Sequence, residues 1–314
     1  MRVLVTGASG FVGAALCRAL LARGHAVRAG VRRRSAPAAE LPPGLTEILV
    51  PDLAAGNLDW RALVEGVDAV AHLAAIAHRT ASEAELRRVN VDATVRLADA
   101  ARGFARRFVF MSSVKVHGDD SGEGAYSETD PARPQDAYGR SKLEAERLLG
   151  ELGARGGMEI ALLRPPLVYG PGVKGNFLRL LQWIDSGLPI PLAAVRNRRN
   201  LIYVGNLADA VVRCIEHPRS LGPFLFGDAE IVSTAELVLR AARALGRPAR
   251  LVSVPPGLLR FAGWVTGRSE EVRRLTGNLV TDTSKARHLL DWQAPYTLDQ
   301  GLAETAHWFR STRA

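Results

Sequence analysis

Short apolar runs alternate with longer amphipathic stretches along the first half of the chain. The runs RVLVT, HAVRAGV, TEILV, DAVAHLA, RFVFMSS and EIALLRPP have the length and character of buried strands. Between them, residues 11–23, 83–102 and 137–150 show the apolar spacing of helices. Strands that alternate with helices form parallel sheets, so the pattern predicts an α/β fold with a Rossmann-type, doubly wound parallel sheet.

The pattern changes beyond about residue 165, where short helical stretches and loops rich in proline and glycine replace the alternation. We expect a sheet domain at 1–165 with a return segment near 200–225, and a smaller, irregular substrate-binding region at 166–199 and 226–314. The longest apolar stretch, 251–267, is interrupted by prolines and an arginine and is shorter than the roughly 20 residues of a membrane span. It predicts a loop and a buried helix, without stable membrane insertion, and contact with a membrane surface is the minor alternative.

Composition narrows the class of protein. With 314 residues, of which 47% are hydrophobic, the chain can bury a large core. Its net charge of +9 comes almost entirely from arginine, but the clusters at 32–34 and 196–199 lack interleaved aromatic residues, so we expect no nucleic-acid partner. The two cysteines and seven histidines lack metal-ligand spacing, and the first residues carry no secretion signal. We therefore expect a cytoplasmic protein without a metal.

A glycine-rich turn follows the first predicted strand. In TGASGFVG, the residues Gly7, Gly10 and Gly13 have GxxGxxG spacing and lead directly into the first predicted helix. Glycines allow a tight turn and a close approach of the backbone, so a pyrophosphate can sit on the amides at the helix N-terminus. The strand before the turn and the helix after it supply the required context. The segment therefore predicts a dinucleotide-binding domain.

The end of the second predicted strand bears on the choice of cofactor. An acidic side chain there binds the ribose 2'-hydroxyl of NAD, whereas a 2'-phosphate needs positive charge. The sequence places Arg32, Arg33 and Arg34 after Val31, which favours NADP(H) and leaves NAD possible. After the third predicted strand, Asp52 is a candidate for the adenine amino group, and a simple turn aspartate is the alternative.

Tyr138 and Lys142 lie four residues apart in the predicted helix at 137–150 and therefore share a helix face. We expect the Lys142 ammonium to lower the pKa of the Tyr138 phenol, which makes the phenol a usable acid or base near neutrality. Ser112 and Ser113 follow the fifth predicted strand. A serine hydroxyl beside this phenol would polarise a carbonyl during hydride transfer with a nicotinamide.

The motifs TGASGFVG, HLAA, SSVKVHG, YGRSKLEAE, LRPPLVYGPG, RNLIYVGNLADA and DTSKARHLLDW extend over essentially the whole chain. In them the chain resembles the extended short-chain dehydrogenase/reductases, in particular the nucleotide-sugar epimerases and dehydratases. The resemblance implies that Tyr138 is the acid/base, that Ser113 binds the substrate carbonyl and that Lys142 holds the nicotinamide ribose. It also implies that Asn90 organises the site and that Arg199 contacts the substrate diphosphate, with a structural role in a basic loop as the alternative for Arg199.

The resemblance also completes the expected site and suggests an assembly. A homodimer is implied, in which the helices at 83–102 and 137–150 pair with their copies. The expected cofactor-binding residues are Gly7, Ser9, Gly10, Phe11, Val12, Gly13, Arg32, Arg33, Asp52, Leu53, Ala74, Tyr138, Lys142 and Pro165, and the expected substrate-binding residues are Lys115, Asn176 and Arg199.

Three departures from the family pattern shape the functional prediction. Leu167 stands where the sugar-nucleotide epimerases often have an asparagine that contacts the diphosphate. The missing acid after the second predicted strand weakens the case for a tightly held NAD. Lys115 would share a face with Ser113 and point toward substrate if the strand continues, and a lysine on a loop is the alternative.

These features favour an NADPH-dependent 4-ketoreductase acting at C4 of a UDP-hexose, of the kind used in surface-polysaccharide sugar synthesis. The alternative is a UDP-glucose or UDP-N-acetylglucosamine 4-epimerase with NAD, which uses the same residues. A third hypothesis is a protein that binds a dinucleotide without catalysis. It leaves the combination of Ser113, Tyr138 and Lys142 without a purpose.

Overall fold

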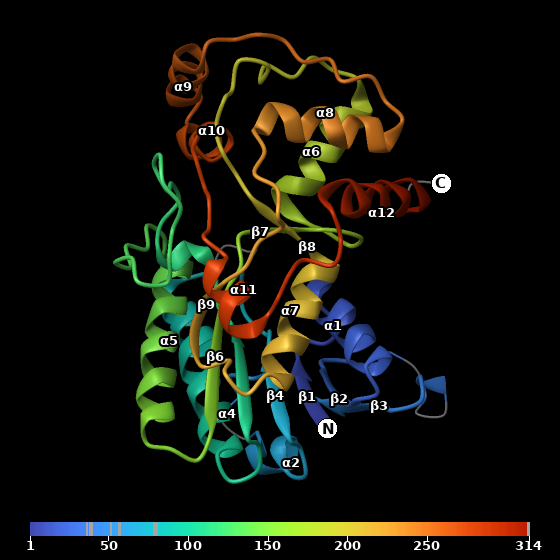
Figure 1. Ribbon diagram of the computed structural model, residues 1–314, viewed down its shortest axis with the longest axis vertical. Coiled ribbons are helices and arrows are strands. Elements are labelled where there is room, and N and C mark those ends of the chain that lie inside the picture. The colour runs from blue at the N-terminus through green and yellow to red at the C-terminus, as the bar shows by residue number, and fades with distance from the viewer. Residues whose placement is uncertain (36, 38–39, 51, 56–57, 78–80, 313–314) are drawn as a thin grey trace.

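The computed structural model describes residues 1–35, 37, 40–50, 52–55, 58–77 and 81–312. Figure 1 shows a sheet flanked by helices in the lower half of the molecule and a group of helices above it. The strands are β1 (Arg2–Thr6), β2 (Ala26–Val31), β3 (Leu45–Leu49), β4 (Ala69–His72), β5 (Arg107–Met111), β6 (Glu159–Arg164), β7 (Leu167–Tyr169), β8 (Leu201–Tyr203) and β9 (Gly222–Leu225).

The helices differ in type as well as in length. The α-helices are α1 (Phe11–Ala22), α2 (Trp60–Val64), α3 (Glu83–Leu86), α4 (Ala93–Ala101), α5 (Ala137–Ala154), α6 (Gly175–Ser186), α7 (Val204–Glu216), α8 (Thr234–Leu245), α9 (Pro256–Val265), α10 (Ser269–Thr276), α11 (Ser284–Leu290) and α12 (Leu298–Ser311). A π-helix, η2 (Arg87–Asp92), joins α3 to α4, and a short 3₁₀ helix, η3 (Val114–Val116), follows β5.

Seven strands form one parallel sheet in the order β3-β2-β1-β4-β5-β6-β9, which confirms the predicted doubly wound α/β fold. The first strand β1 lies inside the sheet and pairs with β2 on one side and with β4 on the other, so that Val3 lies beside Val27 and Ala69. The chain winds outward in both directions from this point. In such sheets ligands bind at the carboxyl ends of the strands near the reversal. A separate two-stranded parallel sheet contains β7 and β8.

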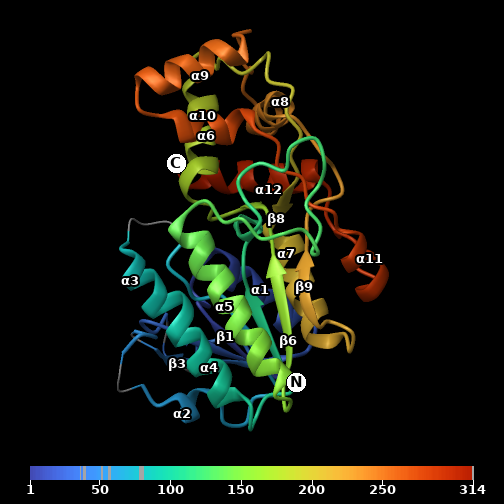
Figure 2. The ribbon, with the colours of Figure 1, turned by 90° about the vertical axis from the view of Figure 1, so that its left-hand side faces the viewer.

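Helices cover both faces of the main sheet, which is why its strands are apolar almost throughout. One hydrophobic core lies between the sheet and α1 and α7, and it includes Leu16, Leu20 and Val211. The second core lies on the other face, where Leu97 of α4 and Leu149 of α5 pack against the strands. Figure 2 shows α3, α4 and α5 along this second face. The helices α6, α8 and α12 lie above the carboxyl ends of the strands.

The apolar stretch near residue 260 differs from its prediction. Helix α9 forms there, but Phe261 is 62% exposed and Trp264 is 72% exposed, so the prediction of a buried helix is wrong. Hydrophobic content identified the helix and could not reveal whether any other element covers its outer face. No helix in the described part of the chain combines the length and the apolar character needed to cross a bilayer.

Candidate active site

The glycine turn between β1 and α1 has the geometry that a pyrophosphate requires. Gly7 has a φ of 69°, a left-handed conformation that glycine adopts without strain. A side chain at Gly13 would overlap the carbonyl oxygen of Gly7, so the turn can close only with glycine at that position. The N-cap of α1 is Gly10, and no side chain caps this end of the helix. The backbone N–H groups of the first turn therefore suit a phosphate, and the turn fits a dinucleotide.

The other expected cofactor residues follow the ends of neighbouring strands. The registers align Thr6 with Gly30 and His72, and His72 with Phe110. The segments that follow β1, β2, β4 and β5 therefore lie along one edge of the sheet. These segments, with those that follow β3 and β6, carry Ser9, Phe11, Val12, Arg32, Arg33, Asp52, Leu53, Ala74, Ser113 and Pro165.

Three of these residues bear on cofactor choice. Arg32 and Arg33 are exposed directly after β2, where a 2'-phosphate or solvent can reach them. The Asp52 carboxylate accepts a hydrogen bond from the Ala54 amide at 2.9 Å, which is the geometry of a turn aspartate. The contact that we predict between Asp52 and the adenine stays a prediction.

The structure brings Ser113 and Tyr138 together. Ser113 is the N-cap of η3, and its hydroxyl accepts a hydrogen bond from the Lys115 amide at 3.3 Å. Tyr138 lies in the first turn of α5, whose N-cap Asp136 accepts a hydrogen bond from the Gly139 amide at 2.7 Å. The Ser113 hydroxyl lies close enough to the Tyr138 phenol to lower the pKa of that group. Two caps therefore fix the serine and the tyrosine against each other.

Lys142 lies one helical turn beyond Tyr138 and is 2% exposed. Its Nζ donates a hydrogen bond to the Met111 carbonyl oxygen at 2.7 Å and lies 4.5 Å from the centroid of the Phe110 ring. The distance from Nζ to the centroid of the Tyr138 ring is 5.9 Å. Burial lowers the pKa of the ammonium to about 7, and the Glu146 carboxylate opposes this shift.

The expectation that Lys142 lowers the pKa of the Tyr138 phenol is wrong for the protein alone. Burial raises the pKa of Tyr138 above its ordinary value, and the Asp136 carboxylate raises it further. The nearby Ser113 hydroxyl lowers this pKa but does not offset the two effects that raise it. Because burial lowers the pKa of Lys142 to about 7, this side chain carries only part of its charge at neutral pH, and it adds nothing to the effects that set the pKa of the phenol. Tyr138 therefore carries its proton at neutral pH.

Lys115 does not lie on a continued strand, so the expectation that it shares a strand face with Ser113 is wrong. The strand ends at Met111 and the chain turns into η3. The Lys115 ammonium forms ion pairs with Asp136 and with Asp119, the latter at 3.0 Å. The alternative of a lysine just past the strand describes its position, and its two carboxylate partners tie it to the N-terminus of α5.

Asn90 lies in the π-helix η2, inside the segment that the sequence predicts as one continuous helix. Its side-chain oxygen accepts a hydrogen bond from the Ile76 amide at 2.8 Å. Its side-chain nitrogen donates to the Ile76 carbonyl at 3.1 Å and to the Ser141 hydroxyl at 3.0 Å. The asparagine is completely buried and joins the segment after β4 to α5 beside Lys142. π-helices occur often at functional sites.

Of the expected substrate residues, Lys115 lies beside Ser113, whereas Asn176 and Arg199 belong to other elements of the chain. Asn176 is exposed in the first turn of α6. The Arg199 guanidinium donates hydrogen bonds to the carbonyl oxygens of Arg274 and Gly277, the latter at 3.3 Å. These bonds hold the C-terminal end of α10, so Arg199 has the structural role that we named as its alternative. A contact with substrate stays a prediction for both residues.

The structure contains a buried ion pair beneath the site that the sequence analysis did not predict. Arg164 of β6 donates from Nε and Nη2 to the Glu146 carboxylate at 3.0 and 2.5 Å, and both residues are less than 10% exposed. Glu146 lies four residues after Lys142, just as Lys142 lies four after Tyr138, so all three share one face of α5. In the sequence, the same four-residue spacing continued for one more turn beyond Lys142 would have identified Glu146 as a member of this face.

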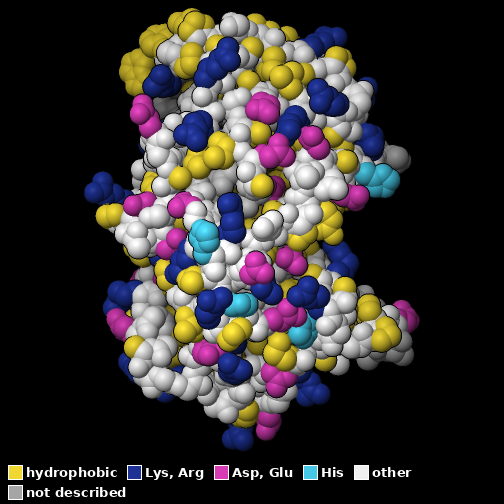
Figure 3. Space-filling view, in the orientation of Figure 1, with side chains coloured by type: hydrophobic (Ala, Val, Ile, Leu, Met, Phe, Trp, Pro, Cys, Tyr) yellow, Lys and Arg dark blue, Asp and Glu magenta, His cyan; other side chains and the backbone are white. Residues whose placement is uncertain are grey.

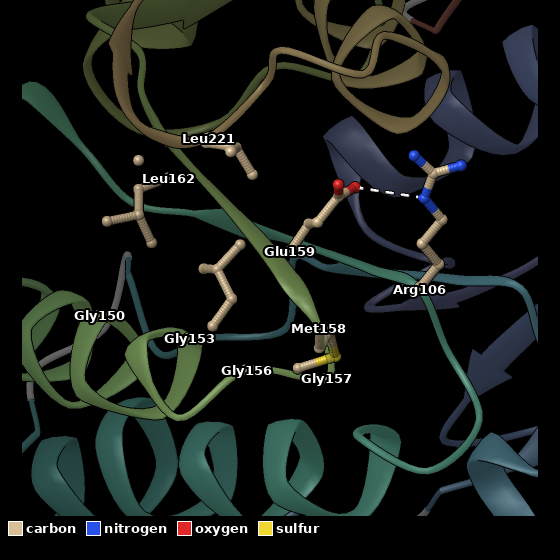
Figure 4. Close-up of a pocket in the computed structure, with 11 residues that line it drawn as sticks. Arg106, Gly150, Gly153, Gly156, Gly157, Met158, Glu159, Leu162 and Leu221 are labelled. Atoms are coloured by element: carbon tan, nitrogen blue, oxygen red, sulfur yellow. Dashed lines mark ion pairs between the residues drawn. The ribbon is translucent and has the colours of Figure 1, made fainter.

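The cavity in Figure 4 is not part of this constellation. It has a volume of about 530 Å³ and lies at the opposite edge of the sheet, beside Met158 and Glu159, where β6 begins. Glycines from the C-terminal end of α5 line much of it, and the Glu159 carboxylate pairs with Arg106 at 3.4 Å. Among the described residues, no group of three or more His, Cys, Asp or Glu side chains could hold a metal ion.

Comparison with known proteins gives this geometry a context. Residues 3–225 match the model of the NAD-dependent epimerase/dehydratase family. A UDP-glucose 4-epimerase of Vibrio cholerae is 38% identical over 317 residues, which cover 98% of this chain and 95% of that protein. The UDP-glucose 4-epimerase of Thermus thermophilus, solved with NAD, has a TM-score of 0.78 and 25% identity over 99% of each chain. MoeE5, solved with UDP-glucose and NAD, has a TM-score of 0.78 and 30% identity over 100% of each chain.

Proposed function

Because the chain belongs to the NAD-dependent epimerase/dehydratase family and is an enzyme of the extended short-chain dehydrogenase/reductase type, we propose that it is an NAD-dependent 4-epimerase of a UDP-hexose. The observation that carries the proposal is the identity of 38% with a UDP-glucose 4-epimerase over nearly the whole of both chains. The sequence alone favours a ketoreductase, and this relative is the reason for preferring the alternative.

The proposed reaction gives each side chain a definite task. Tyr138 removes the proton of the C4 hydroxyl, and Ser113 holds the oxygen as it becomes a carbonyl. A bound NAD would take up the hydride from C4, and once the keto sugar had turned over in the site, it would return the hydride to the opposite face of C4. Tyr138 then gives the proton back, so neither the cofactor nor the protein changes overall. The raised pKa of the phenol makes proton removal the more demanding of its two tasks.

Two further residues contribute to the proposed reaction by binding the cofactor and by positioning the helix that carries Tyr138. Lys142 lies on the same helix face as Tyr138 and has the donors to hold the nicotinamide ribose. Asn90 is a positioning residue, since its bonds to Ile76 and Ser141 fix the segment after β4 against α5. The turn at Gly7, Gly10 and Gly13 takes the pyrophosphate.

One observation favours a second candidate, an NADPH-dependent 4-ketoreductase. Arg32 and Arg33 are exposed after β2, and an acidic residue for the ribose 2'-hydroxyl is missing from the arginine run there. In that reaction Tyr138 only donates its proton to the developing alkoxide, a task that suits a phenol protonated at neutral pH. The two candidates differ in whether the reduced cofactor is consumed.

The experiment is to incubate the purified protein with UDP-glucose or UDP-N-acetylglucosamine and to follow the anomeric proton signals by NMR. The proposal predicts that at least one of these two UDP-sugars is converted to its C4 epimer, without a net change in the absorbance of the reduced nicotinamide. Tyr138→Phe should abolish it, while Tyr296→Phe, a change at a 47% exposed tyrosine in another part of the molecule, should not. Stoichiometric loss of NADPH with a UDP-4-keto-6-deoxy-N-acetylhexosamine, without any epimer, would favour the ketoreductase.

A further inference from the structure

Helix α9 presents an apolar stripe to solvent. Leu258, Phe261, Trp264 and Val265 recur at the three- and four-residue spacing of one helix face. They are 58%, 62%, 72% and 63% exposed, respectively. The rings of Phe261 and Trp264 lie 6.1 Å apart, so the two aromatic residues form one surface. Four large apolar side chains on one short helix form a contiguous patch, and such patches on soluble proteins mark sites of interaction.

The stripe belongs to a helix that is held in place on its other side. Gly263, the buried residue of α9, lies so close to Val272 of α10 that a methyl group there would overlap it. Leu259 packs against the main hydrophobic core. The exposed side chains therefore face outward because the helix is anchored by its inner face. Figure 3 shows a hydrophobic surface at the upper left end of the molecule, where Figure 1 places α9.

Arginine is the main charged residue of the chain around the stripe, and the exceptions are Glu270 and Glu271 in the first turn of α10. From residue 237 to residue 269 the chain contains six arginines and no aspartate or glutamate. Arg260 lies within α9 and Arg268 follows it, and both are exposed. The whole chain carries a net charge of +9. An apolar, aromatic stripe with arginines beside it is complementary to the surface of a bilayer that contains anionic lipids.

We propose that α9 docks the protein reversibly on an anionic membrane surface, with Leu258, Phe261, Trp264 and Val265 in the boundary between headgroups and acyl chains. Helix α9 has ten residues, so it would lie in the plane of the surface. It lies at the end of the molecule toward which the strands of the sheet point, as Figure 2 shows. Docking would therefore turn the edge that carries Ser113 and Tyr138 toward the bilayer.

The site region and α9 are also connected through α10. Asp119, which pairs with Lys115, lies 3.6 Å from the guanidinium of Arg273 on α10. The carbonyl oxygen of Arg274 accepts a hydrogen bond from Arg199.

The docking proposal does not depend on the proposed reaction, because it concerns only where the protein resides when it acts.

The test is co-sedimentation of the full chain with vesicles of phosphatidylcholine alone and of phosphatidylcholine with about 30% phosphatidylglycerol. The proposal predicts binding to the anionic vesicles that weakens at high salt and on Arg260→Glu. The double variant Phe261→Ser/Trp264→Ser should bind at least tenfold more weakly. The matched control is Leu188→Ser, a change at a leucine that is 61% exposed outside α9, and it should bind like the wild type.

Thermal unfolding and NAD binding verify that each variant is folded. Absence of binding to anionic vesicles by the folded wild type would overturn the proposal, as would equal binding of the wild type and the double variant. If the wild type does not bind vesicles but forms a concentration-dependent dimer, and the double variant stays monomeric, the stripe is an interface with a second copy of the chain instead. Activity on soluble UDP-sugars should be equal in the wild type and the double variant, so failure of the proposed reaction is detected separately.

Discussion

Replacing Lys142 by methionine should stabilise the free protein while it abolishes turnover. Burial lowers the pKa of this ammonium from 10.5 to about 7. At about 1.4 kcal/mol per unit, the shift corresponds to roughly 5 kcal/mol against the buried charged form. Methionine fills a similar volume without a charge. The variant loses the hydrogen bond to the Met111 carbonyl and the contact with the Phe110 ring, which together offset about 2–4 kcal/mol. The net gain should be about 1–3 kcal/mol at pH 6.

The sign of the pH dependence follows from linkage. The unfolded chain binds the Lys142 proton more tightly than the folded chain does, so the penalty is full below pH 7 and vanishes as the pH rises toward 10.5. Between pH 6 and pH 9 the free energy of unfolding of the wild type should therefore rise by about 2–3 kcal/mol relative to that of the variant.

Urea unfolding at the two pH values measures both stabilities, with Lys174→Met as the control at an exposed lysine. A stability advantage of Lys142→Met over the wild type that stays constant or grows as the pH rises would refute the reasoning. The control should show no such change in its difference from the wild type.

The remaining predictions concern the cofactor turn, the phenol and two buried polar groups. Gly13→Ala should weaken NAD binding at least tenfold in a calorimetric titration, because the added methyl group overlaps the Gly7 carbonyl; unchanged affinity would contradict the assigned turn. Tyr138→Phe should lower kcat by roughly a thousandfold or more with little change in NAD affinity, and residual activity near that of the wild type would exclude it as the acid/base. Asn90→Ala should lower the free energy of unfolding by about 1–3 kcal/mol and lower kcat, and a change in KM alone would argue against its positioning role. Glu146→Gln should cost about 3–5 kcal/mol of stability in chemical denaturation, because Arg164 is left buried without a countercharge, and a loss below 1 kcal/mol would contradict this.

The fold was accessible from sequence because its signals are local. Each buried strand is a short apolar run, and the turn at Gly7–Gly13 requires glycine for steric reasons. The pairing of Tyr138 with Lys142 on one helix face follows from the helical repeat. These elements are specified by residues close together in the chain, so their patterns survive without knowledge of the tertiary contacts.

The errors concern contacts between distant segments. The ion pair of Lys115 with Asp136 joins residues that lie 21 positions apart, and spacing along the chain does not reveal it. The raised pKa of Tyr138 depends on burial, which the helical pattern at 137–150 cannot measure. The exposure of Trp264 depends on which elements pack against α9. In each case the deciding quantity is a tertiary environment.

The most direct test of the central claim is incubation of the enzyme and NAD with UDP-glucose that carries deuterium at C4. A 4-epimerase returns the same hydride to the same carbon, so we expect UDP-galactose with deuterium retained at C4 and no accumulation of NADH. Failure to form the epimer, together with stoichiometric oxidation of NADPH by a UDP-4-keto sugar, would contradict the account and assign the protein as a ketoreductase.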